Sequence, residues 1–204
     1  AGGMPIEMIT NRLAGNVPGI VISNAKYDEL MQNYGAVNIK NVTEAIAANE
    51  LAMGYTDPFA SSTGLNFLLT ALNAFDSENL LGAEAVASFE SFQTNVPFVA
   101  STTLQMREAA SSGVLDAFVL EYQTFQNEAD LKVSYKFIPF GVRHDNPLYA
   151  VGDISQEKKE ILKAFAEFAL QSKYQDKATS YGFNALEDYQ AEIAMPDGKV
   201  IGAA

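Results

Sequence analysis

The chain has 204 residues and a formal net charge of −12, with 48% apolar and 19% charged residues. This apolar content is enough for a packed core and excludes wholesale disorder. A chain this acidic is repelled by phosphodiester backbones and contains no basic patch, which argues against DNA or RNA binding. The sequence has no cysteine and one histidine, which excludes disulfides, thiol nucleophiles and multi-histidine metal sites.

The first 55 residues are expected to form short strands and helices. The expected elements are a strand at 6–9, a turn at Asn16-Val17-Pro18-Gly19, a buried strand at 19–23, a helix at 24–34, a short helix through Ala48 capped by Asn41-Val42-Thr43-Glu44, and a strand at 51–55. The chain begins with Ala1 rather than methionine, and no apolar run is long enough to span a bilayer. We therefore expect a processed or excised part of a longer protein, with its signal segment absent.

The most informative stretch is the turn that follows the strand at 51–55. Three consecutive hydroxyl residues, Ser61, Ser62 and Thr63, stand before Gly64 at the start of an expected helix over 63–75. Such hydroxyls can cap the helix, or they can leave its first N–H groups and the positive end of its dipole open to an anion. One cap needs one hydroxyl, so three exceed that role, and both interpretations stay open at this point.

Downstream, helices and strands continue to alternate. The spacing i, i+3, i+4 and i+7 predicts one buried face on the helix over 63–75, made of Leu65, Leu68, Leu69 and Leu72. The other expected elements are a helix within 77–94 that buries Val86, Phe89 and Phe92, a strand at 97–100, a helix at 103–111, strands at 116–122, 133–139 and 147–151, a long helix capped by Ser155 that buries Ile161, Leu162, Phe165, Phe168 and Ala169, a helical turn that ends at 181–184, and a weakly patterned tail from Ala185. This alternation predicts a parallel or mixed sheet covered by helices, with ligands where strand ends meet helix starts.

A second hydroxyl-rich junction, Ser101-Thr102-Thr103, repeats the strand-to-helix arrangement. A helix cap is the commoner role for such residues, and ligand contact is the alternative. Glu121 and Tyr122 end the expected strand at 116–122, where they could reach a ligand. A tyrosine in that place more often packs against its neighbours, so both roles stay open for Tyr122.

The segment Arg143-His144-Asp145 lies between two expected strands. Arginine can bind an anion through paired hydrogen bonds, which makes Arg143 a candidate ligand contact. His144 and Asp145 could be two members of a catalytic triad, but no G-x-S-x-G turn accompanies them, and a polar loop is the preferred interpretation. Asp57, which precedes a proline, is better explained by a turn than by a cation site.

The order of these motifs resembles the type II periplasmic-binding-protein fold of bacterial extracellular solute-binding proteins of ABC transporters, and in particular the molybdate- and phosphate-type oxyanion binders. The resemblance spans roughly 19–184. It is carried by GYTDPFASSTG at 54–64, by TTLQM at 102–106 with DAFVLEY at 116–122, by the strand pair within 135–149, and by the long helix that ends in YGF at 181–183.

The resemblance implies an α/β architecture with two lobes of mixed or parallel sheets flanked by helices, in which this chain lacks the first part of lobe one. It implies a remainder of lobe one and crossover at 1–55, the second lobe at 56–140, and a return to lobe one with C-terminal helices at 141–204. The implied ligand contacts are Ser61, Ser62, Thr63, Gly64, Ser101, Thr102, Thr103, Tyr122 and Arg143.

The function that this resemblance implies is the capture of a small anionic or polar ligand in a cleft between lobes, for ABC-type uptake or sensing, without catalysis, cofactor or metal. The implied location is the bacterial cell surface, with an ABC permease or a fused domain as partner and a membrane anchor outside this chain. The alternative is a non-catalytic interaction or scaffold domain of a larger surface protein with a degenerate cleft. A hydrolase that uses His144 and Asp145 is the weakest hypothesis, because it needs an activated serine nearby.

Overall fold

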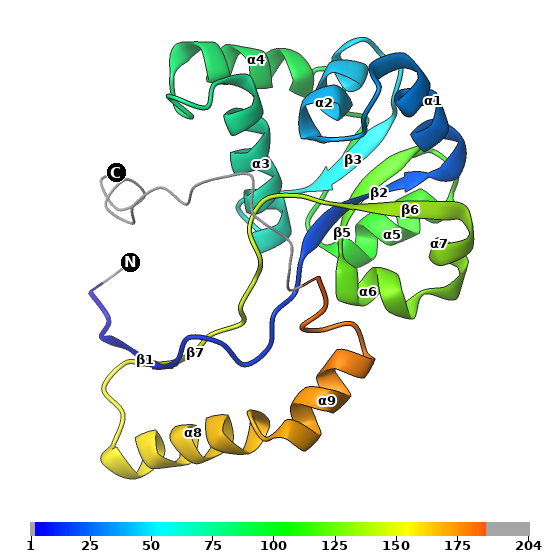
Figure 1. Ribbon diagram of the computed structural model, residues 1–204. Coiled ribbons are helices and arrows are strands. Elements are labelled where there is room, and N and C mark those ends of the chain that lie inside the picture. The colour runs from blue at the N-terminus through cyan, green and yellow to red at the C-terminus, as the bar shows by residue number, and fades with distance from the viewer. Residues whose placement is uncertain (1–2, 187–204) are drawn as a thin grey trace.

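The computed structural model describes residues 3–186 and contains a five-stranded mixed sheet and a separate two-stranded ribbon (Figure 1). The strands are β1 Ile6–Thr10, β2 Pro18–Ser23, β3 Met53–Thr56, β4 Phe98–Ala100, β5 Ala117–Glu121, β6 Tyr135–Pro139 and β7 Leu148–Val151. The helices are α1 Asn24–Tyr34, α2 Ile39–Ala47, α3 Ser62–Phe75, α4 Ala83–Gln93, α5 Thr103–Ser111, α6 Tyr122–Asn127, α7 Ala129–Ser134, α8 Gln156–Ala169 and α9 Ser172–Ser180. The predicted α/β class with a mixed sheet flanked by helices is confirmed.

The sheet has the strand order β4-β3-β5-β2-β6. β3 runs parallel to both β4 and β5, whereas β2 is antiparallel to β5 and β6. The carboxyl ends of β3, β4 and β5 therefore lie at one edge of the sheet, and α3 and α5 begin just beyond it (Figure 1). This edge is where a strand-to-helix junction can present N–H groups to a ligand.

Successive side chains of the strands point to opposite faces of the sheet and pack into two separate hydrophobic cores. On β2, Ile20 and Ile22 belong to the core under α1–α4, and Val21 belongs to the core under α5 and α6. On β5, Val119 and Phe118 divide in the same way. The alternation explains why the strands read as continuous apolar runs: both of their faces are covered.

The ribbon pairs β1 with β7 antiparallel, and α8 packs along it (Figure 1). Two chain segments, 11–17 and 140–147, cross from the sheet to this ribbon. The division into 1–55, 56–140 and 141–204 stays a prediction. Because β2 and β3 share the sheet with β4–β6, however, the sheet unit already begins near residue 18. The expected tail beyond residue 186 lies outside the described residues.

The predicted leucine face of α3 is confirmed at Leu72 and wrong at Leu65, which is 46% exposed; Leu68 and Leu69 are half-buried. Besides Leu72, the buried side of the helix carries Phe67 and Ala71 together with polar Asn66 and Thr70. The turn before α3 sets the orientation in which the helix packs on the sheet, and this orientation decides which side of the helix is buried. The spacing of the leucines does not predict that orientation.

The predicted buried face of α8 is also wrong. Ile161, Phe165 and Phe168 are 61%, 51% and 50% exposed, and within the helix only Ala166 is buried. The physical reason is that a two-stranded ribbon is narrow and covers one stripe of a helix. Ser155 is the N-cap of α8, as predicted, and its hydroxyl accepts from Lys158 N at 3.4 Å.

Three local predictions also fail. Asn38, and not the segment from Asn41, caps α2. Val86 on α4 is exposed, although Phe92 on the same helix is buried as expected. Val133, expected in a strand, ends up 77% exposed in α7, because two short helices occupy 122–134 before β6 begins. Within residues 3–186, no helix has the length and apolar character needed to cross a membrane.

Replacement of Gly64 by alanine is expected to reduce the free energy of unfolding by roughly 1–3 kcal/mol or more. An alanine Cβ would lie 1.9 Å from the carbonyl oxygen of Thr56, which is backbone and cannot rotate away. Urea unfolding measures the change. Ser62→Ala, at the exposed neighbouring position, should stay within about 0.5 kcal/mol of the parent. An equally small effect of Gly64→Ala would contradict this close approach.

Candidate functional site

The two hydroxyl-rich junctions lie side by side at the carboxyl edge of the sheet. Thr56 at the end of β3 pairs with Ala100 at the end of β4, and the N–H of Asp57 donates to the carbonyl of Ala100 at 2.7 Å. The turn before α3 is therefore tied to the strand before α5. The structure brings the predicted residues 61–64 and 101–103 together at neighbouring strand ends.

Two of the three hydroxyls of the first junction are engaged within the chain. Ser61 is the N-cap of α3: its Oγ accepts from Gly64 N at 3.4 Å and from the Thr56 hydroxyl at 3.0 Å. Thr63 is fully buried and donates its hydroxyl to the carboxylate of Glu121. Ser62 is exposed, and its hydroxyl makes no hydrogen bond to any described residue. The capping interpretation holds for Ser61, and Ser62 is the hydroxyl that stays available.

The second junction is a reciprocal cap. Thr102 is the N-cap of α5 and accepts from Gln105 N at 3.2 Å, while the side chain of Gln105 accepts from Ser101 N at 3.0 Å. This resembles a capping box, except that Gln105 reaches the N–H of the residue before the N-cap, and it satisfies two backbone donors with side chains. Ser101 and Thr102 are exposed, so their hydroxyls also face outward from this edge.

Each of these helix starts keeps unused backbone donors. The N–H groups of Ser62 and Thr63 in α3, and those of Thr103 and Leu104 in α5, have no acceptor among residues 3–186. The first N–H groups of a helix carry its positive partial charge. Thr63 is fully buried, so the donors of this set that belong to residues reached by water or a ligand are those of Ser62 in α3 and of Thr103 and Leu104 in α5.

The end of β5 contributes a carboxylate and an aromatic ring to the same edge. Tyr122, the first residue of α6, packs edge-on against Phe137 with 5.2 Å between the ring centroids, which is the packing role considered for it. Glu121 is half-buried and accepts from Thr63. Among the described residues, no lysine or arginine forms an ion pair with Glu121. The negative charge at this edge is therefore not neutralised within residues 3–186.

The segment 141–146 forms one of the two crossings and is held from two sides. His144 and Asn16 exchange backbone hydrogen bonds of 2.8 Å each, which joins the two crossing segments. From α3, the buried amide of Asn66 donates to the carbonyl of Val142 at 2.6 Å and accepts from its N–H at 3.1 Å. The same amide lies 3.1 Å from His144 Nε2.

Arg143 is an ion-pair partner at the crossing. Its guanidinium binds Asp145 at 2.7 Å, and Arg12 of the other crossing segment approaches the same carboxylate at 3.5 Å. Arg12 also donates to the side-chain oxygen of Asn184, which in turn accepts from Gly15 N at 2.8 Å. Arg143 thus takes part in a network that ties the crossing segments together.

Sequence reasoning missed Asn66, Arg12 and Asn184. The signal for Asn66 was present, because a carboxamide within a leucine-rich helix needs partners when it is buried. Arg12 and Asn184 are separated by most of the chain, and no local pattern connects them.

His144 is the one group at the crossing whose ionisation is clearly perturbed. Burial lowers the pKa of His144, and the carboxylates of Glu121 and Asp145 oppose that effect in part. The imidazole is therefore neutral at neutral pH, as its contact with the Asn66 amide requires. In residues 3–186, no hydroxyl hydrogen-bonds to His144, and no group of three or more His, Cys, Asp or Glu residues is placed to hold a metal ion. The described arrangement therefore provides hydrogen-bond donors at the sheet edge and a neutral imidazole held by the Asn66 amide.

Comparison with known proteins agrees with this geometry. The family model described as bacterial extracellular solute-binding protein matches residues 10–184. Among curated proteins, no match was found. The predicted resemblance to the type II periplasmic-binding-protein fold is confirmed by the family match and by the solved structures that share the fold.

Three solved structures illustrate the shared fold. An ABC transporter protein from Clostridium perfringens ATCC 13124 has a TM-score of 0.62 and 15% identity, over 94% of this chain and 58% of its own. A protein described as an extracellular solute-binding protein from Bordetella parapertussis has a TM-score of 0.61 and 17% identity, over 87% of this chain and 54% of its own. A periplasmic thiamin binding protein has a TM-score of 0.59 and 11% identity, over 89% and 54%. The chain thus spans a little over half the length of these proteins, and at such identities the likeness shows the fold alone.

The free energy of unfolding is expected to fall as the pH drops below the ordinary histidine pKa of about 6.5. Because the pKa of His144 is lowered in the folded chain, the unfolded chain takes up the proton first, and stability is lost until the pH passes the folded pKa. Urea unfolding at several pH values, compared with His144→Gln, isolates this contribution from that of the carboxylates.

The only histidine of the sequence gives a single imidazole signal in NMR titration, so its pKa can be measured directly. Glu121→Gln is expected to lower the pKa of His144 further, because the attraction of the carboxylate for the imidazolium is removed. Glu157→Gln on α8 is the control and should leave it unchanged. A pKa of His144 at or above the ordinary value in the parent chain would contradict the burial described here.

Proposed function

The chain belongs to the bacterial extracellular solute-binding family, and from this premise we propose that it captures a small anionic or polar solute at the carboxyl edge of β3, β4 and β5. The observation that supports this location best is the pair of adjacent helix starts, each with N–H groups that have no acceptor among the described residues. Helix N-termini bind anions and the oxygen atoms of neutral polar molecules by the same donors.

The proposed contacts are Ser62 and the exposed hydroxyls of Ser101 and Thr102. Thr63 and Gly64 are buried, and the N–H of Gly64 is used by the Ser61 cap, so these two residues support the first turn of α3. Ser61, Thr103, Tyr122 and Arg143 border this set and shape the site. Glu121 adds a constraint: a fully ionised oxyanion placed against Thr63 would face a carboxylate at short range. The arrangement therefore favours solutes that also donate a hydrogen bond, such as protonated oxyanions, polyols or amino acids.

We further infer a place for this activity. As a member of an extracellular family, the chain would deliver its solute at the bacterial surface to an ABC permease or to a fused sensory domain, held near the membrane by an anchor such as a lipid. Binding without turnover is proposed, because the crossing segment holds His144 by structural hydrogen bonds and offers it no hydroxyl among the described residues. Closure of the ribbon unit over the sheet edge would trap the solute by hinge motion at the two crossing segments.

One observation favours a second candidate, a scaffold domain with a degenerate cleft. Two of the three predicted hydroxyls, those of Ser61 and Thr63, are already satisfied inside the chain. A domain that has lost its ligand would keep such internal bonds and still fold. The two candidates differ in one measurable property, which is the binding of a small molecule at this edge.

Titration calorimetry against molybdate, phosphate, sulfate, amino acids and sugars is expected to identify a binder in that panel. For that solute, Ser62→Ala should weaken affinity by roughly three- to tenfold, which corresponds to the loss of one net hydrogen bond. Ser172→Ala, which changes the exposed first residue of α9, is the matched control and should leave affinity unchanged. No heat and no thermal shift across the panel would reject solute binding by this chain and favour the scaffold.

A further inference from the structure

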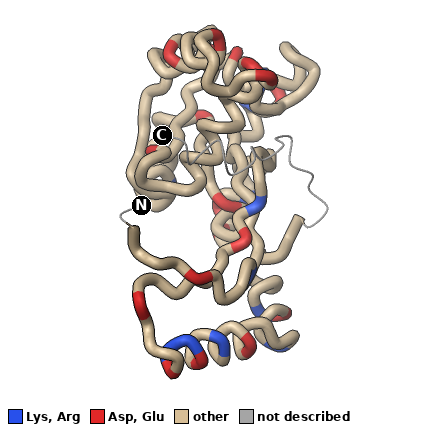
Figure 2. The backbone as a smooth tube through the Cα atoms, turned by 90° about the vertical axis from the view of Figure 1, so that its left-hand side faces the viewer, with Lys and Arg blue, Asp and Glu red and all other residues tan. Residues whose placement is uncertain are grey.

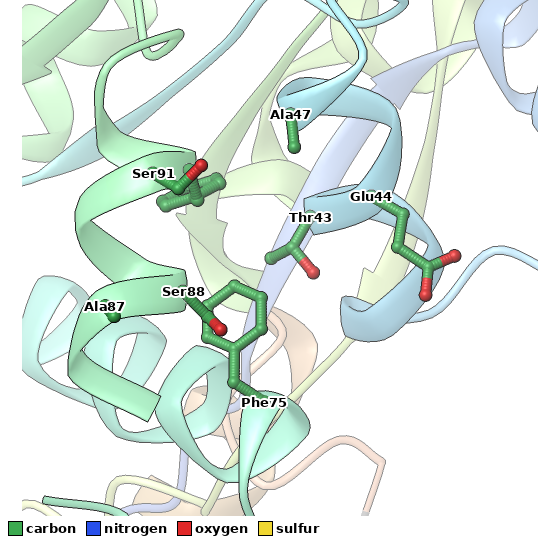
Figure 3. Close-up of a pocket in the computed structure, with 8 residues that line it drawn as sticks. Thr43, Glu44, Ala47, Phe75, Ala87, Ser88 and Ser91 are labelled. Atoms are coloured by element: carbon green, nitrogen blue, oxygen red, sulfur yellow. The ribbon is translucent and has the colours of Figure 1, made fainter. Parts of the chain in front are cut away.

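A groove lies between α2 and α4 (Figure 3), and Figure 1 shows these two helices at the end of the sheet unit away from the start of α3. Its volume is about 380 Å³. Phe75 and Phe92 form an aromatic floor, and small side chains of both helices leave it uncovered; the wall residues are Thr43, Glu44, Ala47, Ala87, Ser88 and Ser91. The groove is therefore apolar at its base and polar along its rims.

The α2 wall of the groove includes the carboxylate of Glu44, and a second carboxylate, that of Glu84, stands one turn before the lining residues of α4. Glu44 is exposed on α2 beside Thr43. On α4, Glu84 stands one turn before Ala87 and Ser88, so the spacing places it on the same stripe of the helix as the wall. Neither Glu44 nor Glu84 forms an ion pair or accepts a hydrogen bond from a residue within 3–186.

The charge of this part of the chain has one sign. From residue 41 to residue 106 there is no lysine or arginine, whereas there are seven carboxylates: Glu44, Glu50, Asp57, Asp76, Glu78, Glu84 and Glu90. The nearest cations in sequence are Lys40, in the first turn of α2, and Arg107. Figure 2 shows mostly red charged segments around the helices at the sheet end of the molecule, whereas blue and red segments alternate along α8 at the other end.

Charges of one sign attract a partner of the other, and an apolar floor attracts an apolar side chain. A lysine or arginine can satisfy both, because its aliphatic stem packs on aromatic surface while its charged end reaches a carboxylate. These carboxylates lie on α2, on α4 and in the turns between the elements, so the acidic field extends beyond the groove and can act on a partner larger than a small molecule. The combination fits a protein segment in which basic residues flank an apolar anchor.

We propose that the groove between α2 and α4 is a docking surface for a basic, amphipathic segment of a partner protein. An apolar side chain of that segment fills the space above Phe75 and Phe92, and its lysines or arginines pair with Glu44 and Glu84. This surface lies apart from the edge at which solute is bound, and the inference does not depend on solute binding.

The test uses a dye-labelled peptide of about twelve residues in which leucines form one helical face and lysines the other. Fluorescence anisotropy measures its affinity for the chain, and backbone amide NMR shifts locate it. The expected result is binding with the largest shifts in α2 and α4. A peptide with serine in place of leucine should bind at least about tenfold more weakly, because it lacks the apolar anchor. Equal binding of the serine peptide, or shifts centred elsewhere, would overturn the proposal.

Two matched double variants distinguish the effect of the groove carboxylates on peptide affinity from the effect of net charge. Glu44→Lys with Glu84→Lys should weaken the leucine–lysine peptide at least about tenfold, whereas Glu157→Lys with Glu160→Lys on α8 should change affinity by less than about twofold. Both double variants alter net charge equally, and both include an exposed first-turn glutamate. Equal weakening by the two would show that only diffuse charge acts, and would reject the docking surface.

Circular dichroism checks that each variant is folded. If the groove double variant does not fold, Ala87→Trp provides a second route, since its indole would occupy the groove without a change of charge. That variant is expected to abolish the amide shifts in α2. Unchanged peptide affinity in Ala87→Trp would contradict the proposed anchor position.

Discussion

The buried side chain of Asn66 links helix α3, which packs on the sheet, to the crossing segment at 141–146. Its buried amide pairs with both the N–H and the carbonyl of Val142, much as a neighbouring strand would, and it also contacts His144. His144 in turn pairs through its backbone with Asn16. An unpaired buried amide costs free energy. The contacts of α3 with the two crossing segments are therefore expected to form and break cooperatively. These bonds hold the crossing segments in place together with the network of Arg12, Asp145 and Asn184.

The geometry of the candidate site depends on how α3 is held against the sheet. α3 reaches the edge with its first turn pressed against the end of β3, where Gly64 leaves no room for a side chain. Thr63 is thereby turned inward to Glu121, and Ser62 is left facing outward. The same bond that secures the helix thus decides which hydroxyl a ligand can meet. The hydrogen bond between Thr63 and Glu121 also brings a carboxylate to an edge that the helix dipoles alone would make attractive to anions. For the proposed function, this carboxylate would disfavour fully ionised oxyanions.

The chain separates its charges in space. Ion pairs concentrate where segments must be held together, as at Arg12, Arg143 and Asp145 on the crossings and between Lys159 and Glu7 on the ribbon. The α2–α4 face has carboxylates without such partners among the described residues. Surface ion pairs contribute little to stability, so a face that leaves its charges unpaired gives up little folding free energy and keeps a long-range field. Because unpaired surface charges cost little folding free energy, an acidic face can coexist with ion-paired crossing segments in one domain.

The sequence by itself determined the local structure and the fold class. The alternation of strands and helices, the helices at 24–34 and 103–111, the N-cap at Ser155 and the buried strands all follow from patterns a few residues long. The family match over residues 10–184 bears out the resemblance that the order of motifs indicated. Only the tertiary structure decided which side of α3 is buried, that Ile161 and Phe165 of α8 stay exposed, and that Asn66, Arg12 and Asn184 hold the crossings. The local sequence pattern indicates which side chains of a segment are apolar enough to be buried. Contacts between residues far apart in the chain decide which of them are in fact covered.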